Sequence, residues 1–246
     1  MKQTELIMGM PVIVEIIAAD EDASAAIATV FDHFRAVDER FSTYKTDSEI
    51  SQINRGLPGS QWSAEMKAVL KLCEHTKQAT NGYFNIMRNG QRDPSGLVKG
   101  WAIQAAADLL LNRQLTNFYI EAGGDIQVDG HNADDEAWRI GIRSPFHRDE
   151  VIKIVAVKSQ GVATSGTYIR GQHIYDPHQP SARLEDVQSL TVIGPNIYEA
   201  DRFATAAFAM GRRGIEFIEA LPGFEAYMID ASQIATLTSG FGRYVV

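Results

Sequence analysis

The spacing of apolar residues along the first 111 positions predicts one strand followed by three helices. Residues 12–17 are rich in β-branched side chains and indicate the strand. In the first helix, apolar residues from Ala26 to Phe41 recur at steps of three and four, which gives it one apolar stripe. The second carries Met66, Val69, Leu70 and Cys73 inward, and the third is rich in alanine. The first helix is expected at about 26–41 and the third at about 97–111. The second is expected to begin after an N-cap at Ser63 and to end at Asn81-Gly82.

After position 111 the apolar period changes to two, which is typical of strands with one buried face. The strands are expected at 118–121, 126–128, 138–143, 151–157, 189–193, 225–229 and 243–246, with helices at 198–210 and 215–221. Gly123-Gly124 joins the first two of these strands in a tight turn. We therefore predict an α+β fold with mixed, largely antiparallel sheets and long flanking helices, in a single domain spanning residues 1–246.

Composition narrows the class of protein. The chain has 246 residues, 45% of them hydrophobic and 22% charged, which excludes a disordered tail and a small disulfide scaffold. Its single cysteine, Cys73, forms no internal disulfide and no zinc cluster, so a reducing compartment is expected. The net charge of −8 disfavours a nucleic-acid partner. With no long apolar run and no signal-peptide pattern at the start, we expect a cytoplasmic protein without a membrane span.

Residues 93–101, at the start of the third predicted helix, are suited to binding an anion. Their sequence is Asp-Pro-Ser-Gly-Leu-Val-Lys-Gly-Trp. Small residues at a helix N-terminus expose backbone N–H groups, and Lys99 adds a positive charge one turn into the helix. The spacing does not match that of a P-loop. The alternative interpretation is a capped helix with a surface lysine.

A hydroxyl and a carboxylate are paired on the helix predicted at 198–210. Asp201 and Thr205 lie four residues apart and therefore share one helix face. Hard oxygen ligands of this kind suit Mg²⁺ or Ca²⁺. The alternative is that Asp201 caps the helix and Thr205 bonds back to it.

Two further segments carry polar groups without a clear structural role. Thr164, Ser165 and Gly166 have the hydroxyls and small size that suit phosphate oxygens if they lie in a loop. His173, a few residues later, has the intrinsic pKa of a base that works near neutral pH. Each alone is more typical of ordinary structure, and so is Gly123-Gly124-Asp125 as a turn.

Taken together and in this order, the segments resemble the FAD:protein FMN transferase family, the ApbE-like flavinyltransferases. The resemblance extends from Met8 to about Met210. The motifs that carry it are Met8-Gly9, Phe41-Ser42-x-Tyr44 with Ser48-Glu49-Ile50, Asp93-x-x-Gly96-x-x-Lys99-Gly100, Gly123-Gly124-Asp125-Ile126, Ala163-Thr164-Ser165-Gly166-x-Tyr168, His173-Ile174-x-Asp176-Pro177 and Ala200-Asp201-x-x-x-Thr205.

The resemblance implies a Mg²⁺-dependent reaction in which FAD is cleaved at its pyrophosphate. AMP leaves, and FMN is attached through a phosphoester to a Thr or Ser of an acceptor protein. The residues implied to contact FAD are Met8, Tyr44, Tyr83, Phe84, Asn85, Asp93, Lys99, Thr164, Ser165, Gly166 and Tyr175. The implied Mg²⁺ ligands are the Gly96 and Ala204 carbonyls, the Asp201 carboxylate and the Thr205 hydroxyl. His173 corresponds to the histidine that deprotonates the attacking hydroxyl or water.

The segment between Asn85 and Asp93 is shorter than is typical of the family, and Asn85 stands where an aspartate is usual. A shorter segment implies a more open flavin pocket. Two alternatives therefore stand beside the transferase. One is an FAD pyrophosphatase that uses the same site with water as acceptor and gives FMN and AMP. The other is a flavin-binding protein without turnover, which release of AMP would exclude.

Overall fold

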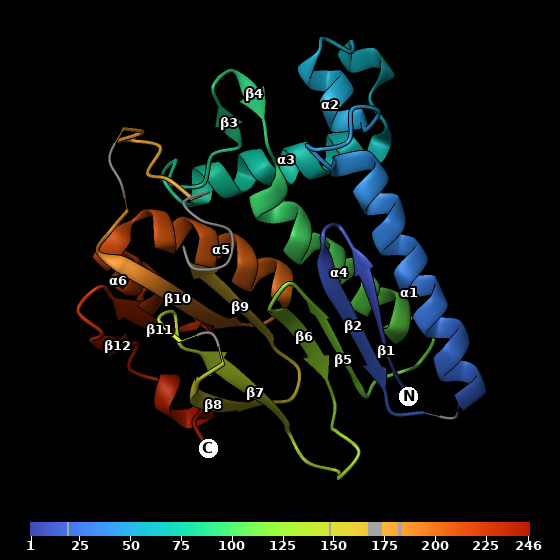
Figure 1. Cartoon of the computed structure of the whole chain (residues 1–246), viewed down its shortest axis with the longest axis vertical. Helices are drawn as coiled ribbons and strands as arrows, with labels where there is room; N and C mark the ends of the chain where they lie inside the picture. Colours follow the sequence, from blue (N-terminus) through green and yellow to red (C-terminus); the bar gives the residue numbers. More distant parts are fainter. Residues whose placement is uncertain (19, 148, 167–173, 182–183) are drawn as a thin grey trace.

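The computed structural model describes residues 1–18, 20–147, 149–166, 174–181 and 184–246. An eight-stranded sheet runs through it, with helices on one face and a β-hairpin on the other (Figure 1). Its strands lie in the order β1 (Lys2–Ile7), β2 (Met10–Ile16), β5 (Phe118–Ala122), β6 (Asp125–Asp129), β9 (Gly161–Gly166), β10 (Val187–Gly194), β11 (Glu225–Asp230) and β12 (Ala235–Leu237). All neighbouring pairs are antiparallel, which confirms the predicted α+β class.

The helices that pack over one face of this sheet are α1 (Asp20–Phe41), α4 (Ser95–Leu111), α5 (Ile197–Ala209) and α6 (Gly214–Glu219). Two more helices, α2 (Glu49–Asn54) and α3 (Ala64–Ala79), contribute buried residues to the same core. Short 3-10 turns lie at Gly59–Gln61, Gly211–Arg213 and Phe241–Tyr244. As the sequence predicts, the Ser63 hydroxyl caps α3 by accepting from the Met66 N–H at 3.0 Å. None of the helices in the described part of the chain combines the length and apolar composition needed to cross a membrane.

The largest hydrophobic core lies between the helices and the sheet. Alternate residues of β2 point into it, and Val12, Val14 and Ile16 are fully buried. α4 packs against α1, α5 and the sheet, so it has apolar residues on several sides rather than one stripe. The start of α4 and the middle of α5 are therefore held firmly beside each other.

A second core covers the other face of the sheet. The hairpin of β7 (Trp138–Arg143) and β8 (Val151–Val157) forms the pair that the sequence predicts. Its inward residues, such as Trp138, contact apolar side chains from β6, β9, β10 and β11. The 3-10 turn at Phe241–Tyr244 closes this core, and Phe241 is fully buried.

Several predicted elements differ from those observed. The strand expected at 243–246 is wrong, because the Arg243 and Val245 N–H groups donate to the Gly240 and Gly242 carbonyls at 3.2 and 3.3 Å, which forms a 3-10 turn instead. A single bridge, Val155 to Val245, remains there. The loop expected to hold Thr164, Ser165 and Gly166 is the central strand β9. The pattern also does not predict β1, α2 or β12, which are short or lie at the sheet edges.

A small separate hairpin rises beside α3 (Figure 1). It consists of β3 (Met87–Arg88) and β4 (Gln91–Arg92), joined by Asn89 and Gly90, whose φ angles are 51° and 78°. Positive φ at both central residues is what a tight hairpin turn of this type requires. The Asn54 side chain ties the hairpin to α2, because it donates to the Arg92 carbonyl at 2.9 Å and accepts from its N–H at 2.8 Å.

Candidate functional site

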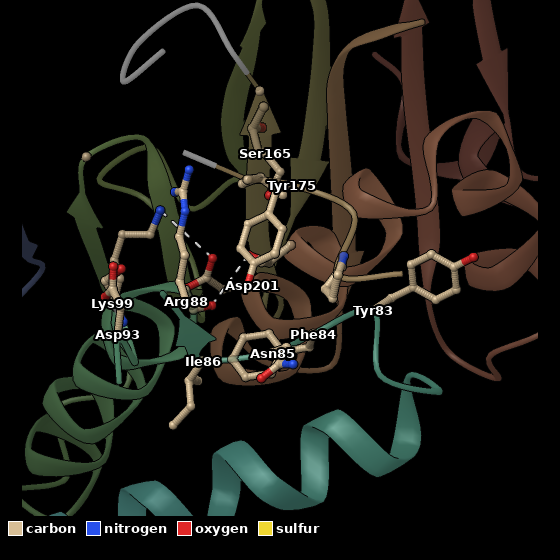
Figure 2. A pocket seen from close by; sticks show the side chains of 18 residues that line it. Tyr83, Phe84, Asn85, Ile86, Arg88, Asp93, Lys99, Ser165, Tyr175 and Asp201 are labelled. Carbon is tan, nitrogen blue, oxygen red and sulfur yellow. Dashed lines mark hydrogen bonds and ion pairs between the residues drawn. The ribbon is translucent and has the colours of Figure 1, made fainter. Parts of the chain in front are cut away.

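A cavity opens where the start of α4, the middle of α5, β9 and the β5–β6 turn come together (Figure 2). It brings together most of the residues that the sequence nominates. These are Tyr83, Phe84, Asn85, Asp93, Gly96, Lys99, Thr164, Ser165, Gly166, Tyr175, Asp201 and Thr205. Segments that are far apart in the chain thus form one concave site.

Four nominated residues are not seen in the cavity wall. Met8 occupies the β1–β2 turn with a φ of 56°, and Tyr44 is 96% exposed on the loop after α1. Ala204 is fully buried in α5, behind the lining residues of that helix. His173 lies outside the described residues, although Ile174 and Tyr175, which follow it, line the cavity.

The centre of the site is a pair of buried carboxylates with an ammonium group. Asp125 and Asp201 are 1% and 3% exposed. The Lys99 Nζ atom lies 2.6 Å from Asp125 Oδ2 and 3.9 Å from Asp201 Oδ1. The protein fixes both acids by backbone groups as well, since Asp125 Oδ1 accepts from the Thr164 N–H at 3.1 Å and Asp201 Oδ2 from the Gly100 N–H at 2.8 Å.

Electrostatics in this centre favour a further cation. Burial raises the pKa of Asp201 well above its ordinary value, and the neighbouring Asp125 carboxylate raises it further. The Lys99 ammonium acts in the opposite direction but does not cancel the shift. Ionised carboxylates in such a place need more positive charge than one lysine supplies.

The donor atoms here fit Mg²⁺. The Thr205 Oγ1 atom donates to the Gly96 carbonyl at 3.4 Å, which places two neutral oxygens at the α4–α5 contact near Asp201. Within the described parts of the chain, no cluster of three or more His, Cys, Asp or Glu side chains is arranged to hold a metal. Mg²⁺ typically uses one or two carboxylates and completes its shell with water and substrate phosphates.

Close packing of α4 on α5 makes this geometry possible. A Cβ atom at Gly100 would lie 2.6 Å from the Asp201 Cβ and 2.9 Å from the Ile197 carbonyl oxygen. Only glycine therefore lets the two helix backbones approach this closely. Asp201 is not the helix cap, since Asn196 caps α5 by accepting from the Glu199 N–H at 2.9 Å. This removes the structural alternative for Asp201.

The 83–86 segment forms the more apolar wall of the cavity. Phe84 is 3% exposed, and its N–H donates to the Thr80 hydroxyl at 3.1 Å. The Tyr83 hydroxyl accepts from Arg213 at 2.7 Å. Asn85 Oδ1 accepts from the Met87 N–H at 2.9 Å, which turns the chain into the β3–β4 hairpin. At least one of the Asn85 amide atoms thus has a structural function.

On the opposite wall, β9 presents its hydroxyl groups from a rigid position. The hydroxyls of Thr164 and Thr191 on β10 are hydrogen-bonded at 2.8 Å, and Ser165 is 7% exposed. A central strand orients such groups more firmly than the loop that the sequence predicts. Tyr175 closes the cavity from another side and donates its O–H to the Met87 carbonyl at 2.9 Å.

Two charged residues of the site are not nominated by the sequence. The sequence predicts Asp125 as a turn residue after Gly123-Gly124, but in the structure it is the first residue of β6 and its side chain is buried. Arg88 sits on the two-residue strand β3 and also lines the cavity. No local pattern of hydrophobic and polar residues signals either residue, and Asp125 stands only in the Gly123-Gly124-Asp125-Ile126 motif by which the sequence resembles the family. Besides Arg88, the unpredicted residues that line the cavity are Ile86, Ser95, Gly123, Ile174 and Pro177.

Comparison with known proteins places this cavity in a family. The sequence profile of the ApbE family matches residues 8–91 and 87–228, which is most of the chain. The chain belongs to the ApbE family. The match covers all the described lining residues, so the cavity is built from the segments that the ApbE profile recognises.

Relatives of this ApbE-family chain include two curated bacterial proteins named FAD:protein FMN transferase. The one from Vibrio cholerae is 34% identical over 162 residues, which cover 62% of this chain and 47% of the relative. The one from Salmonella typhimurium is 27% identical over 146 residues, which cover 56% and 42%. The matched part thus spans less than half the length of each of these relatives.

Solved structures show the same fold. The flavin transferase ApbE from Vibrio cholerae has a TM-score of 0.86 and 23% identity, covering 99% of this chain and 98% of that one. The ApbE protein from Thermotoga maritima has a TM-score of 0.88 and 20% identity, with the same coverage. The profile match confirms the resemblance to the family that the sequence motifs indicate, and these structures show that the fold is shared.

Proposed function

We propose that this ApbE-family protein is a Mg²⁺-dependent FAD:protein FMN transferase. It would cleave the FAD pyrophosphate, release AMP and attach FMN through a phosphoester to a Thr or Ser of an acceptor protein. The observation that carries the proposal is that Lys99 and the start of α4 lie beside the buried acid Asp201 in one cavity, with Asp125 paired to Lys99. The names of the curated relatives support the same activity.

Phosphate groups suit this end of α4. The positive end of the helix dipole faces the cavity, and Ser95 and Gly96 are small enough to let a phosphate approach the backbone. The Asp93 carboxylate accepts from the Ser95 N–H at 3.0 Å and so orders the first turn. The Lys99 ammonium, only 16% exposed, adds a charge that water screens little.

Mg²⁺ would be held by the Asp201 carboxylate, the Thr205 hydroxyl and the Gly96 and Ala204 carbonyls. When bound, the ion supplies charge neutralisation for pyrophosphate oxygens, which gain negative charge as the bond breaks. The protein positions these oxygens through the backbones of two different helices.

In the transfer step, the acceptor hydroxyl oxygen forms a bond to the phosphorus of FMN, and the bond between that phosphorus and the bridging oxygen breaks. AMP leaves with the electron pair of that bond. His173 would take the proton of the attacking hydroxyl, a role that a neutral imidazole can fill near pH 7. Its chain neighbours Ile174 and Tyr175 line the cavity, which supports this role.

The test is incubation of the purified protein with FAD, Mg²⁺ and candidate acceptor proteins. AMP is quantified by chromatography, and the acceptor by intact mass. We expect the mass of each acceptor molecule to rise by that of one FMN group, and one AMP to be released for each FMN attached. AMP release without acceptor labelling would replace the transferase by an FAD pyrophosphatase. FAD binding without AMP release in any mixture would leave a flavin-binding protein instead.

A further inference from the structure

The β3–β4 hairpin carries two arginines that face different parts of the molecule. Arg88 on β3 lines the cavity described above. Arg92 on β4 lies over the Trp62 ring, with its guanidinium carbon 5.5 Å from the ring centre, and lines a separate hollow beside α3. The hairpin thus presents one of its two positive charges to the cavity.

Tyr175 supports the Arg88 side chain. The guanidinium carbon of Arg88 lies 5.0 Å from the centre of the Tyr175 ring, in a cation–π contact. Figure 2 shows the Arg88 side chain alongside this ring, in the same view as Lys99 and Asp201. The Tyr175 hydroxyl donates to the carbonyl of Met87, the residue before Arg88, so the ring and the strand hold each other.

The base of the hairpin is anchored as well. The Asp93 N–H donates to the Ile86 carbonyl at 2.7 Å, which closes the hairpin at its foot. Asn54 pairs with the backbone of Arg92 through both of its amide atoms. The backbone that carries Arg88 is therefore fixed, although the side chain itself is exposed and able to adjust.

The negative charge of a bound dinucleotide would need a second cationic side chain in the cavity besides Lys99. Among the described lining residues, the acids are Asp93 and Asp201 and the bases are Lys99 and Arg88, and the buried Asp125 carboxylate is paired with Lys99. Lys99 is already engaged by a carboxylate at 2.6 Å. A pyrophosphate adds two negative charges, and the planar fork of arginine matches phosphate oxygens better than a point charge does.

We propose that Arg88 is a phosphate-binding residue of this site, which the β3–β4 hairpin presents to the pyrophosphate of the dinucleotide. The Tyr175 ring supports the flat face of the guanidinium, and its N–H groups donate to phosphate oxygens. This inference rests on the proposed function, because FAD supplies the pyrophosphate. It assigns substrate recognition to a hairpin that lies in the shortened 85–93 segment.

The test compares Arg88→Ala and Arg88→Lys with Arg92→Ala, which removes the same charge from the other strand of the hairpin. FAD affinity is measured by flavin fluorescence in Mg²⁺ buffer, and inorganic pyrophosphate is used as a competitor. We expect Arg88→Ala to weaken FAD and pyrophosphate binding by about 10- to 100-fold, the loss expected for a hydrogen bond to a charged group. The affinity of Arg88→Lys for FAD should lie between those of Arg88→Ala and the unaltered protein, and the affinity of Arg92→Ala should equal that of the unaltered protein. KM for FAD should rise more than kcat falls.

Different outcomes overturn different claims. Unchanged FAD affinity in Arg88→Ala overturns the role of Arg88 and leaves the proposed function intact. Weaker FAD binding with unchanged pyrophosphate competition, or an equal loss in Arg92→Ala, shows that the hairpin matters only for shape, and this also overturns the inference. Failure of the unaltered protein to bind FAD overturns the proposed function and the inference together. Thermal unfolding of each variant verifies that it is folded.

Discussion

The backbone N–H of Gly100 donates to Oδ2 of Asp201 at 2.8 Å, across the contact between two buried helices. The orientation of this carboxylate is therefore set by the backbone of α4, although the residue belongs to α5. A side chain at position 100 would collide with it, because a Cβ there would lie 2.6 Å from the Asp201 Cβ.

Gly100→Ala should separate α4 from α5 and displace the Asp201 carboxylate. We expect a loss of about 1–3 kcal/mol in the free energy of unfolding, as in other overpacked cores, together with loss of Mg²⁺-dependent AMP release. Urea unfolding and AMP quantification measure the two effects. Gly242→Ala is the matched control, since no atom lies within 4 Å of its added Cβ. Full activity and stability in Gly100→Ala would contradict the close approach of the helices.

Asp201→Asn should stabilise the metal-free protein at neutral pH while removing its response to Mg²⁺. Burial raises the pKa of Asp201 in the folded state, so between the unfolded and the folded pKa the folded chain binds more protons. The contribution of Asp201 to the free energy of unfolding is full below its pKa in the unfolded chain, and it is lost as the pH rises through its pKa in the folded chain. The amide removes this dependence.

Thermal unfolding is measured in the presence of a chelator from acid to neutral pH, which tests whether stability falls as the pH rises. The unaltered protein should lose more stability with rising pH than Asp201→Asn does. Added Mg²⁺ should raise the melting temperature of the unaltered protein and leave that of the variant unchanged, because a ligand stabilises only the state that binds it. Identical pH profiles of the two proteins would show that Asp201 is ionised as easily when folded as when unfolded.

Lys99→Met should weaken FAD binding by about 10- to 100-fold, because the ammonium lost from the start of α4 would bond a phosphate oxygen. The substitution also leaves Asp125 and Asp201 without their neighbouring cation. Lys99→Arg, which keeps the charge, should retain most of the affinity. Calorimetric titration with FAD measures both variants, and equal affinity in Lys99→Met would assign the lysine a purely structural role.

Cys73 should react with thiol reagents only after unfolding. Cys73 lies on the buried face of α3, where its side chain is 2% exposed, and this burial raises the pKa of its thiol to about 12, so the reactive thiolate is scarce at pH 8. Labelling with a chromogenic disulfide should be slow in buffer and fast in concentrated urea. Because the chain has one cysteine, the signal reports on a single position. Rapid labelling of the native protein would show that α3 opens locally.

The helices α1 and α3 could be predicted because the apolar stripe of α1 and the Ser63 cap of α3 are local features of the sequence. Strand β9 could not be predicted, because close packing against neighbouring elements allows only small residues there. A Cβ at Gly161 would lie 2.2 Å from the Ile197 N atom at the start of α5, so the strand avoids the large side chains by which strands are usually recognised. Edge strands such as β12 have no buried face to produce an alternating pattern.

The candidate site shows the same division. Asp201 and Thr205 could be nominated because their spacing on one helix is visible in the sequence. Asp125 depends on the register of β5 and β6, which places it opposite Ala122 at the end of the sheet. Arg88 depends on the tether between Asn54 and the hairpin. Both positions are set by long-range contacts, which no local pattern encodes.

The hydrogen bond between Gly100 and Asp201 joins positions 101 residues apart in the chain. During synthesis on the ribosome, α4 and β6 emerge long before α5, so Lys99 and Asp125 are available to each other while Asp201 does not yet exist. The proposed Mg²⁺ and FAD site is therefore incomplete in the nascent chain until α5 has been made. A truncated chain that ends before α5 should bind neither ligand.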